Sequence, residues 1–390
     1  MIRRPRDGRL GVSLAALLLA GGVVGGGRPA PPPREPLLRG VCLAHIHRRE
    51  LGYGSDRSRA TLEELRGLGV TWISLTPFGY QPTVHEPRIL FRGDRSLSDS
   101  GLVREVRAAR AVGLHAILKP HIWGGDFYEG RWPGDIAMPD DAAWDAWFQS
   151  YEAFILHFAR VAETAGADAF CVGCELVQAT RAHPERWRRL IAEVRAVYHG
   201  KLTYAANWYD EYDRIPFWDA LDWIGVNAYF SLSKEETPSA SEIARAWERV
   251  APGLEAVSRR YGRPIVLTEV GFRSVDHAAA NPHDWPEFDP DPRANPAAQA
   301  AAYEGTFQAL WGRPWLRGFF WWKYYTMPGG EGPEETDFTP RGKPAERVMA
   351  RYYGAPDPAE AALDRAERAA DHGARSSGSI RTPGANQGGP

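Results

Sequence analysis

The chain has 390 residues, of which 44% are hydrophobic and 12% aromatic, so it can fill one large core or two smaller ones. Its 47 basic and 49 acidic residues leave a formal net charge of -2, and no block of Lys and Arg follows the first few residues. This balance argues against nucleic acid as a partner. Three cysteines are too few for a disulfide-stapled scaffold.

The first segment, residues 1–27, has a basic start and an apolar run from Leu10 to about Val24, a pattern typical of an export signal or an N-terminal anchor. The run is short and glycine-rich for a membrane-spanning helix. We expect residues 28–38 to form a linker of the Pro/Gly-rich kind; five of them are Pro, and a run of Gly at residues 25–27 directly precedes them. We therefore expect export to the periplasm or the cell exterior, with a membrane tether if the leader is retained. A disordered leader is the alternative.

Eight apolar, strand-like segments follow, each bounded by Gly, Pro, Asp or Asn. They cover residues 40–46, 70–77, 114–122, 168–176, 202–208, 221–230, 264–272 and 316–325. Several are apolar throughout, as expected of strands that helices cover on both faces. Between the segments, apolar residues recur at steps of three and four, as at Trp144, Trp147 and Tyr151, which predicts helices.

Strands that alternate with helices over residues 39–354 predict an α/β fold, a (β/α)8 TIM barrel with a single catalytic domain. An open, doubly wound sheet is the alternative, but no strand leads into a G-x-G-x-x-G or Walker turn. The connections 81–99, 123–141 and 273–296 are long, and in a barrel they lie at the carboxyl ends of the strands, where such enzymes carry their sites. Residues 355–390 predict a low-complexity, disordered tail.

Glu175 and Glu269 stand at equivalent places, each after an apolar run, in the fourth and the seventh strand-like segment. Strand ends of a barrel converge on one pit, so the two carboxylates should lie close together. Acetal hydrolysis needs such a pair, in which one carboxyl donates a proton to the departing oxygen and the other faces the developing positive charge as an anion. Partial burial would raise the pKa of Glu175 enough to keep a proton near neutral pH. The alternative is structural, with each Glu paired to a nearby cation or facing solvent.

Polar and aromatic side chains at other strand ends are candidates for substrate binding. Lys119 and His121 lie on one strand face by period two, and a lysine at the end of an apolar strand needs a partner or a ligand. Asn207 and Trp208 close the fifth segment and place an amide beside a ring that can stack on a sugar. Structural alternatives stay open, namely an ion pair for Lys119 and a turn cap for Asn207.

Cys171 and Cys174 have the C-x-x-C spacing of redox and zinc sites. On a regular strand, residues three apart face opposite sides, so we expect the two sulfurs not to converge on one ligand. The sequence therefore predicts no metal site here.

Several stretches, taken together and in order, resemble the clan A (β/α)8 glycoside hydrolases, and most closely glycoside hydrolase family 113, over residues 39–354. They are "LKPHIW", "GCELV", "GVNAYF", "PIVLTEVGFRS" and "GFFWWKYY". The resemblance implies a retaining O-glycoside hydrolase, endo-β-mannanase-like, that cleaves β-linked hexose glycans, foremost β-1,4-mannan, by double displacement and without a cofactor.

The same resemblance implies roles for individual residues. It makes Glu175 the acid/base and Glu269 the nucleophile. Tyr229 matches the tyrosine that hydrogen-bonds the nucleophile. Trp322 matches the aromatic floor beneath the sugar being cleaved, with its neighbour Trp321 pointing the other way.

One position departs from the clan pattern, because Cys174 stands where many members have an Asn that contacts the sugar 2-hydroxyl. Other clan activities therefore stay open, namely β-glucanase, β-galactosidase or transglycosylase. A different class of alternative is a non-catalytic sugar-binding barrel. We expect a monomer whose partner is an oligosaccharide or polysaccharide, without nucleic acid and with membrane contact only through the N-terminal segment.

Overall fold

The computed structural model describes residues 35–92, 97–285, 289, 291–330 and 334–354. The predicted export leader, most of the predicted linker and the predicted tail lie outside these residues. All helices and strands described below belong to one compact unit, Leu37–Pro390. Within the described part of the chain, no helix combines the length and the apolar character needed to cross a membrane.

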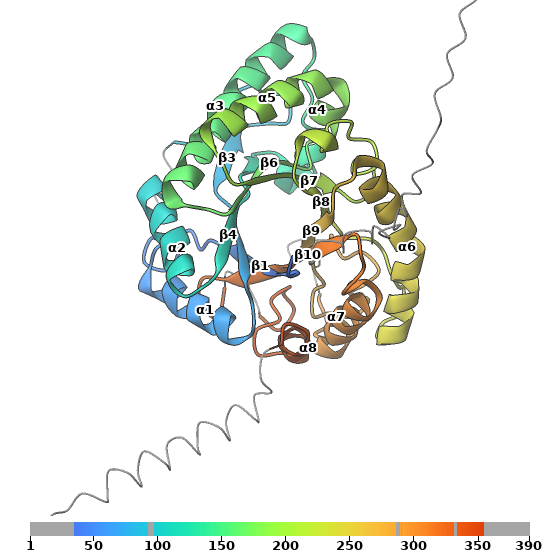
Figure 1. Cartoon of the computed structure of the whole chain (residues 1–390). Helices are drawn as coiled ribbons and strands as arrows, with labels where there is room; N and C mark the ends of the chain where they lie inside the picture. Colours follow the sequence, from blue (N-terminus) through green and yellow to red (C-terminus); the bar gives the residue numbers. More distant parts are fainter. Residues whose placement is uncertain (1–34, 93–96, 286–288, 290, 331–333, 355–390) are drawn as a thin grey trace, which may run out of the picture. The chain divides into compact units, whose positions relative to one another are not determined.

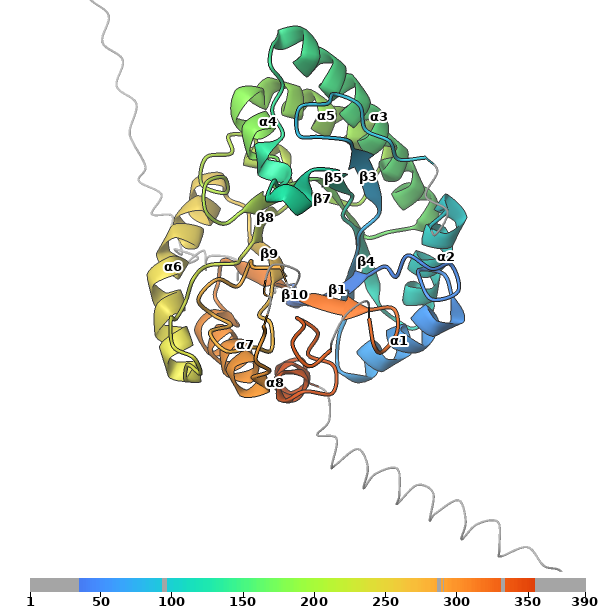
Figure 2. The same ribbon diagram turned by 180° about the vertical axis from the view of Figure 1, so that it is seen from behind.

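Eight parallel strands close into a barrel in the order β1-β10-β9-β8-β7-β6-β4-β2. The strands are β1 (Leu38–Ala44), β2 (Trp72–Leu75), β4 (His115–Leu118), β6 (Ala169–Cys174), β7 (Lys201–Asn207), β8 (Ile224–Asn227), β9 (Ile265–Val270) and β10 (Leu316–Tyr325). Each matches one predicted segment, and the helices surround the ring of strands (Figures 1 and 2). The predicted (β/α)8 barrel is confirmed.

The helices between the strands form the outer layer. They are α1 (Asp56–Gly67), α2 (Asp99–Ala111), α3 (Asp141–Ala165), α4 (Val177–Ala182), α5 (Pro184–Val197), α6 (Ala240–Tyr261), α7 (Pro296–Leu310) and α8 (Pro344–Tyr352), with short 3-10 turns η1 (Phe127–Glu129), η2 (Pro133–Asp135) and η3 (Trp218–Ala220). In α3 the predicted aromatic face is buried, and the helix begins after Asp140, whose side chain accepts from the Ala143 N–H, and ends at Gly166 in the left-handed conformation.

The predicted strand over residues 114–122 is two strands. β4 ends at Leu118, and β5 (His121–Gly124) pairs instead with β3 (Phe78–Gln81) in a separate two-stranded sheet. Pro120 separates them because it has no N–H to donate to a continuing ladder. Lys119 therefore stands just beyond the end of a barrel strand, and His121 opens the next one.

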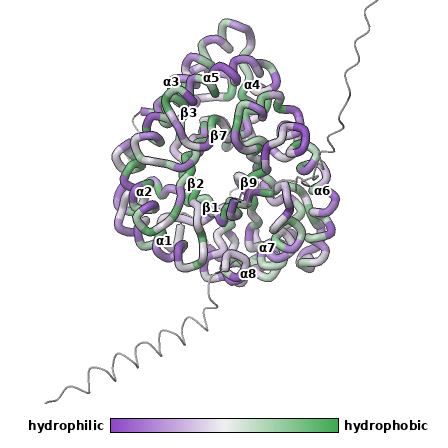
Figure 3. Tube along the Cα trace, viewed as in Figure 1, coloured by the Kyte–Doolittle hydropathy of each residue, from purple (hydrophilic) through white to green (hydrophobic). Residues whose placement is uncertain are grey.

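The barrel strands pack on both faces. One face joins the core shared with the helices, and the other lines the barrel interior through Leu38, Cys42, Ile117, Ala169, Cys171, Cys174, Ala205, Trp223, Val266 and Phe320. Figure 3 shows the hydrophobic colouring along the strands and hydrophilic stretches on the surrounding helices. The apolar runs in the sequence follow from this double burial.

The expectation that Cys171 and Cys174 face opposite sides of a strand is wrong. The register between β6 and β7 shifts between these two residues, and both side chains join the interior cluster. An irregularity of this kind adds one residue to one strand and so breaks the two-residue alternation. Cys42, Cys171 and Cys174 are all free thiols.

Gly173 lies where three aromatic side chains meet β6. An added Cβ would lie 2.7 Å from Tyr204, 2.8 Å from the Tyr151 hydroxyl and 2.9 Å from Trp187. We predict that Gly173→Ala lowers the free energy of unfolding by about 1–3 kcal/mol, measured by urea unfolding, because a packed core cannot give way. In the control Gly67→Ala, at the end of α1, the new Cβ meets nothing within 4 Å. That control should not be destabilised, and a Gly173→Ala protein as stable as the wild type would contradict the packing.

Candidate active site

Two glutamates mark the carboxyl end of the barrel. Glu269 is the fifth residue of β9, and Glu175 follows the last residue of β6. The backbone of Glu175 turns into the left-handed region with φ 54, and its N–H donates to the Ala205 carbonyl at 2.9 Å. A non-glycine residue pays on the order of 1 kcal/mol for this conformation, which the surrounding structure must impose. Strand β6 thus ends in a fixed turn that sets the direction of the Glu175 side chain.

Glu269 is buried and surrounded by donors. Its Oε1 forms an ion pair with Lys119 Nζ, and its Oε2 accepts a hydrogen bond from the Tyr229 hydroxyl at 2.7 Å. Lys119 is fully buried as well, and its ammonium also donates to the Thr268 carbonyl at 3.3 Å. Burial alone would lower the pKa of Lys119, but the Glu269 carboxylate outweighs burial and holds that pKa above its usual range. The ammonium is therefore a permanent counter-charge for Glu269.

Glu175 has amide partners but no cation in contact among the described residues. It is half-buried, and Asn207 Nδ2 donates to its Oε1 at 3.3 Å. Burial, and then the negative charge of Glu269, raise the pKa of Glu175 to about 8, although hydrogen bonds from Asn227 and Asn207 oppose the shift. At neutral pH the site therefore contains one carboxyl that holds its proton and one carboxylate paired with an ammonium.

The structure brings the other predicted site residues around these two carboxyls. His121 Nε2 lies 3.8 Å from Glu269 Oε1, and the Trp208 ring packs 5.6 Å from the Tyr229 ring. Trp322 faces the interior cluster, with Lys119 Nζ 5.6 Å from its ring centroid. Trp321 instead stacks on Tyr303 of α7 with ring centroids 3.7 Å apart, so the two neighbouring tryptophans point to opposite sides of β10.

Asn227, at the end of β8, is a site residue that the sequence analysis missed. Its Nδ2 donates to Cys174 Sγ at 3.4 Å, and its Oδ1 accepts from Thr268 Oγ1 at 2.9 Å. It also acts on Glu175, whose pKa it lowers against the effect of burial. Cys174 is the position that departs from the pattern named in the sequence analysis, and Asn227 brings a side-chain amide to its sulfur from the strand two places away. An Asn that closes an apolar strand two residues before Tyr229 was the available signal.

Glu211 is the second residue that the sequence analysis missed. It is 2% exposed, and its carboxylate accepts from the Asn207 N–H, the Tyr204 hydroxyl and Thr180 Oγ1 at 2.8, 2.7 and 2.8 Å. Burial raises its pKa to about 7. The Tyr204 hydroxyl in turn accepts from the Leu176 N–H at 2.7 Å. Glu211 thereby ties the segment after β7 to the residue after Glu175, and within "NWYDEY" it looks like any surface acid.

One group of side chains has a spacing that can hold a metal ion. Ligand atoms of His121, Cys174 and Glu269 lie within 4.8 Å of one another. Burial and then the nearby Lys119 ammonium keep the pKa of His121 well below its usual value, and its Nε2 has no hydrogen-bond partner among the described residues. Lys119 already occupies Glu269 Oε1, however, so a divalent ion would have to compete with a buried ammonium. The donor set fits an ion-paired carboxylate better than a metal site.

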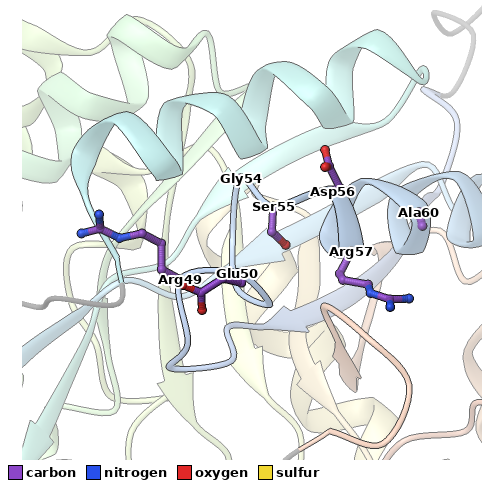
Figure 4. A pocket seen from close by; sticks show the side chains of 7 residues that line it. All are labelled: Arg49, Glu50, Gly54, Ser55, Asp56, Arg57 and Ala60. Atoms are coloured by element: carbon purple, nitrogen blue, oxygen red, sulfur yellow. The ribbon is translucent and has the colours of Figure 1, made fainter.

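A separate pocket lies along the connection from β1 to α1. Figure 4 shows its lining, Arg49, Glu50, Gly54, Ser55, Asp56, Arg57 and Ala60. Charges of both signs are mixed in this lining, and neither Glu175 nor Glu269 belongs to it. It therefore carries no part of the chemistry described above.

Comparisons with known proteins give the following matches. A family model described as Glycoside Hydrolase Family 113 matches residues 45–343. A GH113 β-mannanase from Alicyclobacillus acidocaldarius, solved in complex with ManMIm, is 30% identical with TM-score 0.71, covering 82% of this chain and 97% of that chain. Another solved structure, a complex of a GH113 β-1,4-mannanase, is 29% identical with TM-score 0.72, covering 83% of this chain and 100% of that chain. No curated protein sequence matches the chain.

A more distant likeness concerns the fold alone. A β-glucuronidase from Ruminococcus gnavus is 14% identical with TM-score 0.56, and the match covers 82% of this chain and 50% of that chain. At this identity the similarity shows a shared barrel and nothing about the substrate.

Removal of Lys119 should reveal how strongly it is coupled to Glu269. We predict that Lys119→Met lowers the free energy of unfolding by about 3–5 kcal/mol, because it leaves a buried charge without its cation. The double variant Lys119→Met/Glu269→Gln should regain part of that loss. Urea unfolding of the wild type, both single variants and the double variant gives the coupling energy directly. Losses that simply add would contradict the ion pair.

Glu175 should titrate near pH 8, as followed by 13C NMR of the labelled carboxyl. Folding raises the pKa of Glu175 from 4.5 to about 8, so the folded state binds this proton more tightly than the unfolded state does. The protonated carboxyl therefore contributes to the stability of the fold at low pH. This contribution should be lost as the pH rises from 4.5 to about 8. In Glu269→Gln the Glu175 pKa should fall but stay above 4.5, because burial, the larger cause, persists. An unchanged pKa in that variant would show that the two carboxyls do not interact.

Proposed function

The chain belongs to glycoside hydrolase family 113, and from this membership we propose that it is a retaining endo-β-mannanase with Glu175 as the acid/base and Glu269 as the nucleophile. One observation carries the assignment of roles, namely that the two carboxyls are unequal. Glu175 holds a proton at neutral pH, whereas Glu269 is paired with the Lys119 ammonium. A retaining glycosidase needs this combination of a proton donor and an anion.

In the first step, a Glu269 oxygen attacks the sugar carbon while the bond from that carbon to the bridging oxygen breaks. Glu175 gives its proton to the bridging oxygen, and the leaving sugar departs as an alcohol. Lys119 and Tyr229 hold Glu269 by one oxygen each, so its orientation is set before the substrate arrives. The product of this step is a glycosyl ester on Glu269.

In the second step, the same charges favour the reverse role for Glu175. Ester formation removes the negative charge of Glu269, which is the second cause of the raised Glu175 pKa. The pKa of Glu175 should therefore fall in the glycosyl-enzyme, which leaves a carboxylate ready to accept a proton from water. The water oxygen attacks the sugar carbon, the ester bond breaks, and the starting protonation states return.

The surroundings of the pair suit a sugar with both polar and apolar faces. Trp322 is half-buried and provides an apolar floor, and the half-buried side chains of Glu175 and His121 provide hydrogen-bonding partners. The mannanases with which the chain aligns support β-1,4-mannan as the substrate. An export leader at residues 1–27 would bring the enzyme to such a polymer outside the cell.

The proposal is tested by incubating the wild type, Glu269→Ala and the control Glu255→Ala with oligosaccharides of β-mannan, β-glucan, galactan and xylan. We expect the wild type and the control, which changes an exposed residue of α6, to cleave mannan oligosaccharides with retained anomeric configuration by NMR. Glu269→Ala should lose at least about a thousandfold in kcat. Azide should partly restore its turnover and give the α-glycosyl azide, because the anion occupies the emptied position.

Three outcomes would overturn parts of the proposal. Inverted configuration would exclude double displacement. Cleavage of another glycan in preference to mannan would replace the substrate. Binding of oligosaccharides without any cleavage, in wild type and variant alike, would indicate a sugar-binding barrel.

A further inference from the structure

The connection from β9 to α7 is the long seventh loop of the barrel, and contacts between its two ends close its base. Val275 and Ala294 form an antiparallel bridge, and the Asn295 N–H donates to the Ser274 carbonyl at 2.7 Å. Arg273, which is buried, forms an ion pair with Asp289, with 2.9 Å between Nη1 and Oδ2. The described part of this loop is therefore held at both ends by contacts within the loop.

The tip of the loop contacts two tryptophans on either side of Glu175. The His283 ring lies 5.0 Å from the Trp208 ring, and the Trp285 ring lies 5.4 Å from the Trp123 ring. Trp208 follows β7, and Trp123 lies on β5, which continues the chain from β4. In the barrel, β7 and β4 are the two neighbours of β6, the strand that ends at Glu175. The tip thus passes in front of the end of β6. We use the name aromatic arch for the four residues of these two contacts, Trp123, Trp208, His283 and Trp285.

Part of the aromatic arch is open to solvent. Trp285 is 46% exposed. Tyr128, a neighbour of the arch whose ring lies 5.6 Å from the Trp123 ring, is 68% exposed. Trp123 and Trp208 beneath them are half-buried. The arch therefore joins buried rings beside the carboxyls to exposed rings farther out. The neighbouring rings meet at tilted or edge-on angles, and the exposed Trp285 ring offers a face on which a sugar ring can stack.

The position of the proton donor determines which sugars would reach the arch. Glu175 protonates the bridging oxygen, so the sugar that departs with that oxygen lies on the Glu175 side of the cleaved bond. We propose that the aromatic arch binds the leaving-group sugars, with Trp285 as the platform for a ring on that side. This inference rests on the proposed function, and it implies that the preferred substrate extends past the cleaved bond.

Two substrates separate this subsite from the catalytic centre. Mannotetraose has sugars on the leaving side, whereas a mannobiosyl fluoride of β configuration has only fluoride there. For Trp285→Ala we expect kcat/KM on mannotetraose to fall about two- to tenfold, the range of a lost stacking contact, mostly through KM. The fall on the fluoride should be much smaller. Trp285→Phe, which keeps a ring, should recover most of the activity on mannotetraose.

Glu255→Ala is the control, because Glu255 is exposed on α6, and α6 contributes no residue to the arch. It should behave as the wild type on both substrates. Equal losses of Trp285→Ala on both substrates would overturn the inference, since the loop would then support the catalytic geometry. No loss on either substrate would also overturn it. A wild type that cleaves neither substrate would instead refute the proposed function.

Discussion

The ion pair between Lys119 and Glu269 is the interaction on which the rest of the site depends. Moving each of these two ions out of water costs several kcal/mol, which is comparable to the free energy of unfolding of a whole domain, unless hydrogen bonds compensate for the lost water. Here the Lys119 ammonium donates to Glu269 and to the Thr268 carbonyl, and the second Glu269 oxygen accepts from the Tyr229 hydroxyl. Strand β4, which leads to Lys119, and strand β9, which carries Glu269, lie four places apart in the ring of eight. The pair therefore links opposite walls of the barrel.

This placement of a single lysine makes the two glutamates different. Glu269 has the ammonium, whereas the donors to Glu175 within the described ranges are amides, so burial dominates the Glu175 pKa and keeps its proton in place. Each carboxyl then affects the other, because the charge of Glu269 adds to the shift at Glu175. Both glutamates stand at similar strand ends, so their positions alone do not make one a proton donor and the other an anion. The difference arises because Lys119 reaches Glu269.

Periodicity was sufficient to predict the barrel and the strand-end positions of the two glutamates, because strands buried on both faces appear in the sequence as uninterrupted apolar runs. The prediction failed where one residue breaks the regular alternation. Pro120 divides the segment over 114–122, and the irregularity in β6 turns Cys174 to the same side as Cys171. The pattern of apolar residues does not reveal a shift in pairing between two strands.

Asn227 and Glu211 were missed for a different reason. Their importance comes from partners far along the chain, namely Cys174 for Asn227 and Thr180 for Glu211. From the neighbouring sequence alone, Asn227 is the last residue of a strand and Glu211 is an acid in a polar loop. Only the barrel, which brings the ends of distant strands together, makes them neighbours of Glu175 and Asn207.

The interior of the barrel limits where a glycan can lie. Below the carboxyls the lumen is filled by buried side chains, among them Ile117, Val266 and Phe320, so a substrate has to lie across the carboxyl end. The strand ends then determine the chemistry at one bond, whereas the loops determine how many sugars are bound beside it. The seventh loop spans the end of β6 through aromatic contacts at both of its sides. A change in that loop can therefore alter the required length of the substrate while the ion-paired centre stays the same.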